Sequence, residues 1–405
     1  MVQKIKAGAR IKIKVKAKRK KISKRHPRLK IKLFEQPYSF IIGIIFLVIL
    51  TVLLLSILIY THLTFAANFA DNILRPTIGN QATISIEAFF FRIEDKTNQI
   101  KYFFVKQNPD VLSLNPSKTL KKITNEDNRF LLNKPTLLRG LPVLPEEGIW
   151  KVINTASSDA TMAEIFFRPD QQRPYAIAYL VKMNMRRLIL SAVAGTVEPG
   201  EYLNPGPGKI PNAAMESNTL VAAFNGGFQK KDGEYGMIVG NKTYLPLQKN
   251  LATLVISKES KLKIINYIGQ ALGKDVSSIR QNGPILLQNG RDVSLSNAWN
   301  MQNWGLTTTN TMYTWRSGIG ITKDGDLIYA AGPSLVPETL AAALKAAGAV
   351  DAMQLDINPV WVRFVLFNAL GKGEYKYYPL TKDMVNGGKQ YLSGYQKDFF
   401  YLLEK

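Results

Sequence analysis

The chain has 405 residues, with 53 Lys and Arg against 30 Asp and Glu, no Cys, and two His. Both histidines, His26 and His62, precede the region expected to fold. Because that region has no Cys and no His, it cannot contain a Cys nucleophile, a Ser-His-Asp triad, a His acid–base pair or a Cys/His zinc site. No cofactor or metal site is expected, although oxygen ligands could still bind a hard divalent cation such as calcium or magnesium.

The N-terminal part predicts a membrane anchor. Residues 1–35 carry fifteen Lys or Arg and one acid, and Tyr38–Ile59 follows without a charge and is long enough to span a bilayer once. We predict a basic cytoplasmic tail over 1–35 and a transmembrane signal-anchor helix over 36–66. Because basic residues stay on the cytoplasmic side, the main domain is expected outside a single-pass cell membrane. Cleavage as a signal peptide near Ala66-Ala67 is the alternative.

The charge distribution indicates the partners. The tail is expected to be disordered and to lie on anionic lipid headgroups, with nucleic acid not expected beyond nonspecific contact. Without residues 1–35, the chain keeps 38 basic and 29 acidic residues, which suits an anionic glycan or sugar-phosphate polymer. A large extracytoplasmic region without cysteine favours a bacterial envelope protein.

Residues 67–147 are predicted to be a juxtamembrane extension and linker. Within them Ile84–Phe91 is strand-like and aromatic, whereas the stretch from Asn108 to Pro145 is rich in Asn, Pro and Lys. A compact domain is expected over 148–405.

The fold class predicted for 148–405 is α+β, a strand-rich mixed sheet with few helices. Helices are predicted over Pro337–Ala347 and, shorter, near Pro211–Glu216 and Val276–Arg280, and a further strand over 349–356. Nine other short apolar runs between turn signals predict strands: Glu164–Arg168, Ala176–Lys182, Leu188–Ala194, Leu220–Phe224, Ala252–Ser257, Lys261–Tyr267, Pro284–Gln288, Gly318–Thr322 and Asp326–Ala330.

The first chemical motif is an apolar strand that runs into Asn225, Gly226, Gly227 and Phe228. Glycines allow positive φ and close approach of the backbone to a ligand, and the Asn amide both donates and accepts hydrogen bonds. Sugar hydroxyls or phosphate oxygens fit such a loop, although a plain hairpin turn fits it equally. Asn282-Gly283, before another strand, is a weaker motif of the same kind.

Two charged residues complete the set. Arg316 precedes small residues and an apolar strand, where it can clamp a phosphate or pair with a surface acid. Asp356 ends the strand after the 337–347 helix, a position that can face a ligand crevice or cap a turn. Trp361, five residues later, can stack on a sugar or pack in the core.

In this order and spacing, the motifs resemble the phosphodiester glycosidase family, whose type enzyme removes N-acetylglucosamine from a sugar-phosphate diester. The resemblance covers about residues 148–370. The matching pieces are Phe224–Phe228, Asn250–Ala252, Gly283-Pro284, Arg316–Gly325 and Leu355-Asp356.

The resemblance implies a membrane-anchored extracytoplasmic hydrolase that cleaves a sugar-1-phosphate diester in envelope or exopolysaccharide metabolism. Asp356 is then the nucleophile or the base for water, Arg316 holds the phosphate and Asn225 orients the sugar. One carboxylate suffices, because phosphate leaves as a stable anion, whereas ordinary glycosidases use two. The expected substrate-binding residues are Gly226, Gly227, Phe228, Asn282, Gly283, Asn358 and Trp361.

The sequence departs from the family after Asp356. Where the family has a run of glycines and a Ser, this chain has Ile357, Asn358 and Pro359. Pro has no N–H to offer a phosphate. This departure favours the alternative function, a catalytically inactive envelope protein that binds or scaffolds glycan with the same crevice.

Secondary candidate acids are Asp232, Asp324 and Asp351. Asp324 is explained by a hairpin turn with Gly325, and Asp351 by capping of the helix–strand connection. For a third function, a periplasmic nuclease or nonspecific phosphodiesterase, the sequence lacks the usual metal-ligand clusters.

Overall fold

In the computed structural model, the chain divides into two compact units, residues 1–55 and 56–405. The structure describes residues 42–47, 50–51, 69–104, 134–153, 161–201, 203–294, 312–384 and 387–405.

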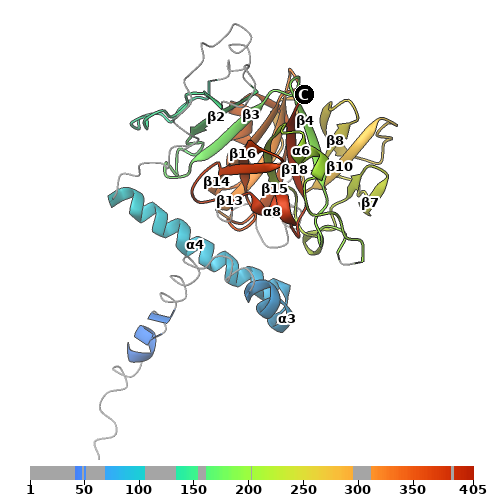
Figure 1. Cartoon of the computed structure of the whole chain (residues 1–405). Helices are drawn as coiled ribbons and strands as arrows, with labels where there is room; N and C mark the ends of the chain where they lie inside the picture. Colours follow the sequence, from blue (N-terminus) through green and yellow to red (C-terminus); the bar gives the residue numbers. More distant parts are fainter. Residues whose placement is uncertain are drawn as a thin grey trace, which may run out of the picture. The chain divides into compact units, whose positions relative to one another are not determined.

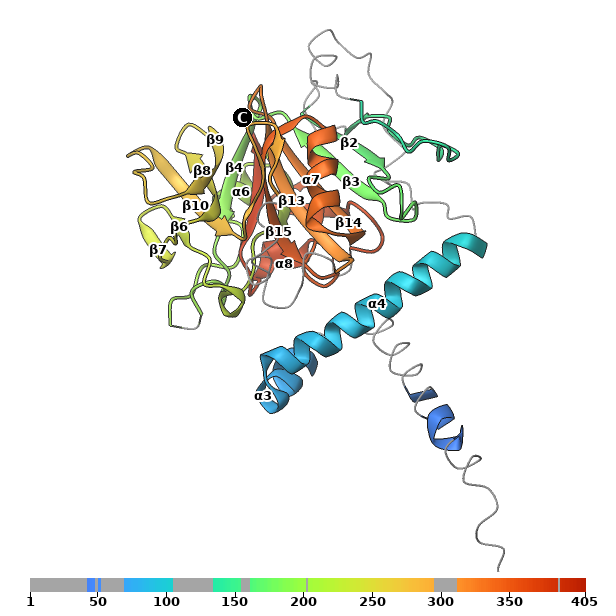
Figure 2. The ribbon, with the colours of Figure 1, turned by 180° about the vertical axis from the view of Figure 1, so that it is seen from behind.

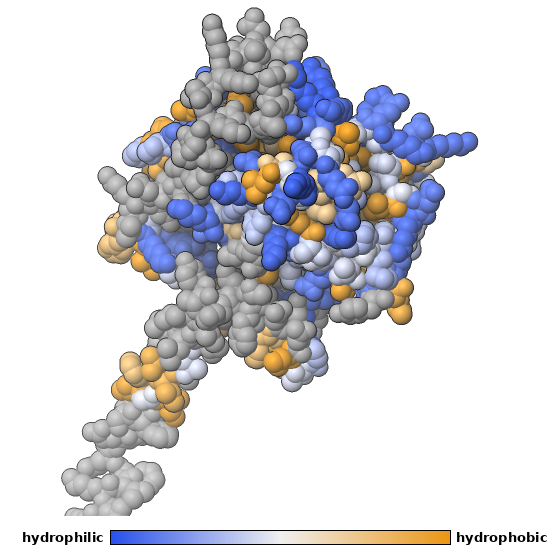
Figure 3. Space-filling view, viewed as in Figure 1, coloured by the Kyte–Doolittle hydropathy of each residue, from blue (hydrophilic) through white to orange (hydrophobic). Residues whose placement is uncertain are grey.

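In the first unit, residues 42–47 are helical and expose large apolar side chains, among them Ile42, Phe46 and Leu47 (Figure 3). Over the described residues, the structure contains no helix that is both long and apolar enough to cross a bilayer. The predicted basic tail, and most of the predicted anchor over 36–66, lie outside the described residues.

The first described elements of the second unit are helical: η1 (Ala70–Leu74), α3 (Arg75–Ile78) and the long α4 (Asn80–Phe104) (Figure 1). The strand-like character predicted for Ile84–Phe91 is wrong, because this stretch lies inside α4. Ala88 and Asp95, seven residues apart, are both buried, which is the spacing of one helix face rather than the alternation of a strand.

The largest sheet has eight strands in the order β1-β2-β3-β14-β13-β15-β11-β12. Helix α7 (Pro337–Ala346) packs against β13, β14 and β15 and covers one face of the sheet (Figure 2). The strands are β1 (Lys151–Ile153), β2 (Met162–Phe167), β3 (Ala178–Met183), β11 (Ile285–Gln288), β12 (Arg291–Asp292), β13 (Thr314–Thr322), β14 (Leu327–Leu335) and β15 (Ala349–Ile357).

Two five-stranded sheets complete the domain. The first has the order β17-β16-β5-β18-β4 and the second β7-β6-β10-β8-β9. Their strands are β4 (Leu188–Val193), β5 (Leu220–Asn225), β6 (Met237–Val239), β7 (Lys242–Leu245), β8 (Leu251–Ser257), β9 (Leu262–Tyr267), β10 (Val276–Asn282), β16 (Phe364–Gly371), β17 (Glu374–Pro379) and β18 (Phe399–Glu404). The short helices are α6 (Asn212–Glu216), η2 (Lys230–Asp232) and α8 (Lys389–Ser393).

The predicted strand-rich α+β class with few helices is confirmed, and each of the nine apolar runs predicted as strands overlaps a strand. The sheet is not mixed, because every pairing between described strands is antiparallel. The predicted helix over Val276–Arg280 is wrong. This stretch is β10, which pairs with β8 on one side and β6 on the other, so tertiary hydrogen bonding overrides its local pattern.

An aromatic cluster joins the sheets behind the site. The ring of Phe224 in β5 lies 5.9 Å from Phe364, 5.3 Å from Phe400 and 5.3 Å from Tyr329, measured between centroids. All four side chains are buried. Rings at such distances pack favourably beyond the area they bury, so the cluster fixes the end of β5 against β14 and β16.

Candidate active site

Asp356 lies at the C-terminal end of β15 and is only 4% exposed. Its backbone is fixed on both sides. The N–H donates to the carbonyl of Gly226 at 3.0 Å, and the carbonyl accepts from Ser317 Oγ at 2.7 Å. These bonds tie β15 to the loop after β5 and to β13, so the carboxylate has one well-defined position.

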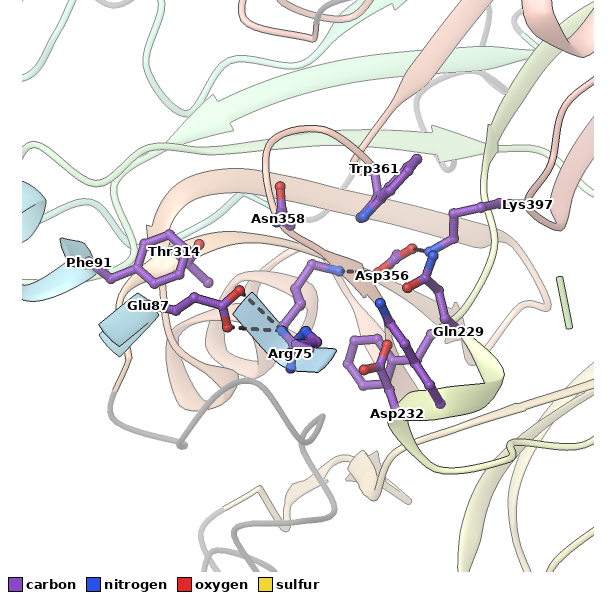
Figure 4. A pocket seen from close by; sticks show the side chains of 13 residues that line it. Arg75, Glu87, Phe91, Gln229, Asp232, Thr314, Asp356, Asn358, Trp361 and Lys397 are labelled. Carbon is purple, nitrogen blue, oxygen red and sulfur yellow. Dashed lines mark hydrogen bonds and ion pairs between the residues drawn. The ribbon is translucent and has the colours of Figure 1, made fainter. Parts of the chain in front are cut away.

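The partner of the Asp356 carboxylate is Lys397. The Lys397 Nζ forms an ion pair with Asp356 Oδ2, while Asp356 Oδ1 accepts from the N–H of Ile357 at 2.9 Å. Burial raises the pKa of Asp356 to about 7, although Lys397 acts to lower it. The Lys397 ammonium also lies 4.8 Å from the ring centroid of Trp361 (Figure 4). Near neutral pH, this carboxyl group can therefore exchange a proton.

Asp356 and Lys397 open onto a pocket that several elements share (Figure 4). The loop after β5 and η2 form one side, the turn after β15 forms another, and α3 and α4 contribute a third. Besides the ion pair, the lining residues are Arg75, Glu87, Phe91, Phe228, Gln229, Lys231, Asp232, Thr314, Ile357, Asn358 and Trp361. Three of the predicted substrate-binding residues, Phe228, Asn358 and Trp361, thus lie beside Asp356.

Asn225 is buried behind the pocket. Its Oδ1 accepts from Tyr329 Oη and from the N–H of Arg363, both at 2.9 Å. Its Nδ2 donates to Ser317 Oγ at 2.9 Å and to the carbonyl of Gly226 at 3.0 Å. Because Ser317 in turn holds the Asp356 carbonyl, Asn225 positions the carboxylate indirectly, whereas its predicted contact with sugar stays a prediction.

Gly226 and Gly227 lie against a buried ion pair, Arg280 with Asp398. Arg280 Nε and Nη2 donate to the two Asp398 oxygens at 2.8 and 3.0 Å. The N–H of Gly227 donates to Asp398 Oδ2 at 3.1 Å. A Cβ added to Gly226 would lie 2.0 Å from Asp398 Oδ2, so the loop needs glycine for close approach.

Asn282 fixes the same loop from another side. Its Oδ1 accepts from the N–H of Phe228 at 3.0 Å, and its Nδ2 donates to the carbonyls of Gln354 and Leu355 at 2.9 and 3.1 Å. The carbonyl of Gly283 accepts from the N–H of Ala252 at 3.0 Å. Neither residue is among those lining the pocket, so both support the site from behind.

Arg316 lies away from the pocket lining. It is fully buried, with Nε donating to the carbonyl of Leu335 and Nη1 to Gln354 Oε1, both at 2.9 Å, and Nη2 to the carbonyl of Met312 at 3.0 Å. Burial lowers its pKa to about 9. In this arrangement, the guanidinium joins the ends of β13, β14 and β15.

The three residues that depart from the family pattern form a tight turn. Asn358 has φ +84°, a conformation that Asn tolerates better than most residues. Its Oδ1 accepts from the N–H of Val360 at 3.0 Å, and its carbonyl accepts from the N–H of Trp361 at 3.1 Å. The turn therefore places the Trp361 indole beside Lys397.

Of the secondary acids, Asp232 lines the pocket, whereas Asp351 Oδ1 accepts from the N–H of Asn289 at 2.9 Å. Asp324 lies in the turn between β13 and β14. Among the described residues, there is no group of three or more His, Cys, Asp or Glu placed to hold a metal ion.

Sequence reasoning missed Lys397 and the Arg280–Asp398 pair. Lys397 is 41 residues beyond Asp356 and belongs to no motif. The available signal was weak: two opposite charges, Lys397 and Asp398, directly before the apolar run of β18.

The central part of the domain matches a known protein family. Residues 218–356 match the phosphodiester glycosidase family. The predicted family resemblance is thereby confirmed. The matched segment contains the Asn225–Phe228 loop and ends at Asp356, whereas Lys397 and Trp361 lie beyond it. A search of curated proteins finds no match to the chain.

Two solved structures are also similar to the chain. One is the catalytic domain of zebrafish N-acetylglucosamine-1-phosphodiester alpha-N-acetylglucosaminidase, auto-inhibited by its pro-peptide. It is 14% identical, with 74% of this chain and 100% of that chain covered and a TM-score of 0.39. The other is a hypothetical protein from Synechocystis, 12% identical, with 61% of this chain and 63% of that chain covered and a TM-score of 0.33.

Proposed function

We propose that the chain is a hydrolase that cleaves a sugar-1-phosphate diester, with Asp356 and Lys397 as its catalytic pair. The observation that carries the proposal is a buried carboxyl group with a pKa of about 7, paired with a cation at the wall of a pocket. Perturbed pKa values of this kind are typical of catalytic acids and bases. The match to the phosphodiester glycosidase family supports the reaction class.

The residues suit this reaction. Asp356, when ionised, either removes a proton from the water that attacks the anomeric carbon, or attacks that carbon itself. In the second case a glycosyl ester forms, which water then hydrolyses to release the sugar and restore the carboxylate. The bond to the phosphate oxygen breaks, and the phosphate leaves as a stable anion that needs little protonation, so a second carboxylate acid is not required. Lys397 favours the ionised form of Asp356 and places a positive charge in the same pocket. Trp361 offers an aromatic face to the sugar ring.

One observation favours the alternative, a glycan-binding envelope protein without catalysis. The turn after Asp356 uses its own backbone donors. Asn358 N–H donates to the Trp315 carbonyl at 3.0 Å, and the N–H groups of Val360, Trp361 and Val362 all bond to Asn358. The turn therefore presents no cradle of backbone N–H groups to a phosphate.

We also propose that the protein is anchored in a bacterial cell membrane by 36–66 and acts on envelope glycan or exopolysaccharide outside it. The uncharged run Tyr38–Ile59 and the exposed apolar side chains of residues 42–47 support this placement. The basic tail is suited to anionic lipid.

The test uses the full-length protein in mild detergent with a methyl diester of N-acetylglucosamine-1-phosphate. The proposal predicts release of free sugar by the wild-type chain. Retention on an immobilised envelope polymer without release of sugar favours the binding alternative.

A further inference from the structure

One wall of the pocket comes from outside the family-matched segment. Arg75 in α3 lines the same pocket as Asp356, and its side chain is 12% exposed (Figure 4). Its Nη2 donates to both carboxylate oxygens of Glu87 at 3.1 Å. Phe91, one turn further along α4, lines the pocket as well. Glu87 of α4 thus holds a guanidinium in the same pocket as the candidate catalytic carboxylate.

Helix α4 is attached to the domain by a second ion pair. Asp95 is buried and accepts from Arg173 Nε and Nη2 at 3.1 and 3.2 Å and from the Tyr175 hydroxyl. The guanidinium of Arg173 also lies 3.5 Å from the ring centroid of Tyr313. These contacts place Glu87 and Phe91, which are about two turns and one turn before Asp95, at the pocket.

A phosphodiester substrate needs a cationic group in the pocket, and Arg75 can supply it. Arg316 is buried among β13, β14 and β15, and Lys397 is paired with Asp356. Lys231 also lines the pocket, but its ammonium is a point charge without the planar fork of an arginine. A phosphodiester carries one negative charge on two free oxygens, to which a guanidinium can donate charge-assisted hydrogen bonds. Glu87 keeps the Arg75 side chain in place before substrate arrives, which reduces the entropy lost on binding.

We propose that Arg75 binds the phosphate of the substrate, so that α3 and α4 form a phosphate subsite for the reaction at Asp356. This inference rests on the proposed function and names a substrate-binding residue outside the matched family segment. If it is correct, substrate recognition requires α3 and α4, which precede the strand-rich domain in the chain. The opposite arrangement, in which α3 merely blocks the pocket, predicts the opposite result in the same experiment.

The test compares full-length wild-type protein with Arg75→Gln, Arg75→Lys and a matched control, Arg291→Gln, which changes an exposed arginine on β12. Loss of a charged hydrogen-bonding pair of this kind predicts a KM about 10- to 100-fold higher for the phosphodiester, with kcat little changed. Arg75→Lys should lie between, and Arg291→Gln should match wild type. An unchanged KM for Arg75→Gln, or a higher kcat/KM, overturns the proposal.

A binding measurement separates this inference from the proposed function. Calorimetry with the methyl diester compares the Asp356→Asn variant, which prevents turnover, with the double variant Asp356→Asn, Arg75→Gln. The double variant should bind the diester more weakly. If wild type releases no sugar but this loss of binding occurs, the hydrolase assignment fails and the phosphate subsite stands. Equal binding by both variants contradicts the subsite whether or not the chain is a hydrolase.

Discussion

The Arg280–Asp398 ion pair should determine whether the loop beside Asp356 keeps its shape, and Asp398→Asn tests this. The substitution keeps the size of the side chain but removes its charge. Both partners are at most 1% exposed, and Asp398 accepts two bonds from Arg280 and one from Gly227. The change leaves the buried guanidinium without a carboxylate.

The expected cost is large. Removing one partner of a buried pair destabilises a protein by about 3–5 kcal/mol, since the remaining charge is uncompensated. For a domain of this size, each kcal/mol lowers Tm by about 2–4 °C, so Tm should fall by roughly 6–20 °C. Arg280→Met combined with Asp398→Leu should recover part of the loss. It recovers only part because the carbonyls of Phe228 and Tyr235 lose the donors that Arg280 supplies.

Thermal unfolding followed by circular dichroism measures the effect. The matched control is Glu259→Gln, which removes a carboxylate paired with Lys261 where both side chains are more than 70% exposed. Exposed pairs contribute little, so this variant should unfold at the wild-type temperature. If Asp398→Asn unfolds at the same temperature as Glu259→Gln, the buried pair does not hold the loop as we describe.

Two further predictions concern the site, and a third concerns the predicted membrane topology. Because Asp356 must be ionised to act, kcat/KM should rise with pH through about 7 and level off above it, and a rate that falls over this range would contradict the assignment. Lys397→Met removes the charge that lowers the pKa of Asp356, so the midpoint of the same profile should move to higher pH; an unmoved midpoint would separate Lys397 from the titrating group. The absence of Cys makes topology testable: a membrane-impermeant thiol reagent applied to intact cells should label Lys261→Cys but not Ser23→Cys, and the reverse pattern would refute the predicted orientation.

The general position of the site could be predicted from the sequence, because its signals are local. A helix, a glycine and an apolar strand place Asp356 at a strand end, and Asn-Gly-Gly places a tight loop after another strand. The strand end and the loop meet through the hydrogen bond from Asp356 N–H to the Gly226 carbonyl. Order and spacing along the chain were sufficient for the family resemblance.

Roles that depend on burial could not be predicted in this way. Arg316 and Asn225 are residue types that bind phosphate and sugar on a surface, yet tertiary packing buries both and directs their hydrogen bonds to protein groups. Lys397 reaches Asp356 only because β18 pairs with β5, a contact between distant parts of the chain. Likewise, β10 was misread because pairing with β6 and β8, rather than its local pattern, sets its conformation. Residues 84–91 were misread because their apolar and aromatic composition hid the helical spacing of Ala88 and Asp95.

The most direct test of the account is hydrolysis of the N-acetylglucosamine-1-phosphate methyl diester by full-length wild-type protein and by Asp356→Asn, with folding of both verified by circular dichroism. The account predicts sugar release by wild type and a rate at background for the variant. Equal release by the two proteins would contradict the role of Asp356 as the catalytic carboxylate.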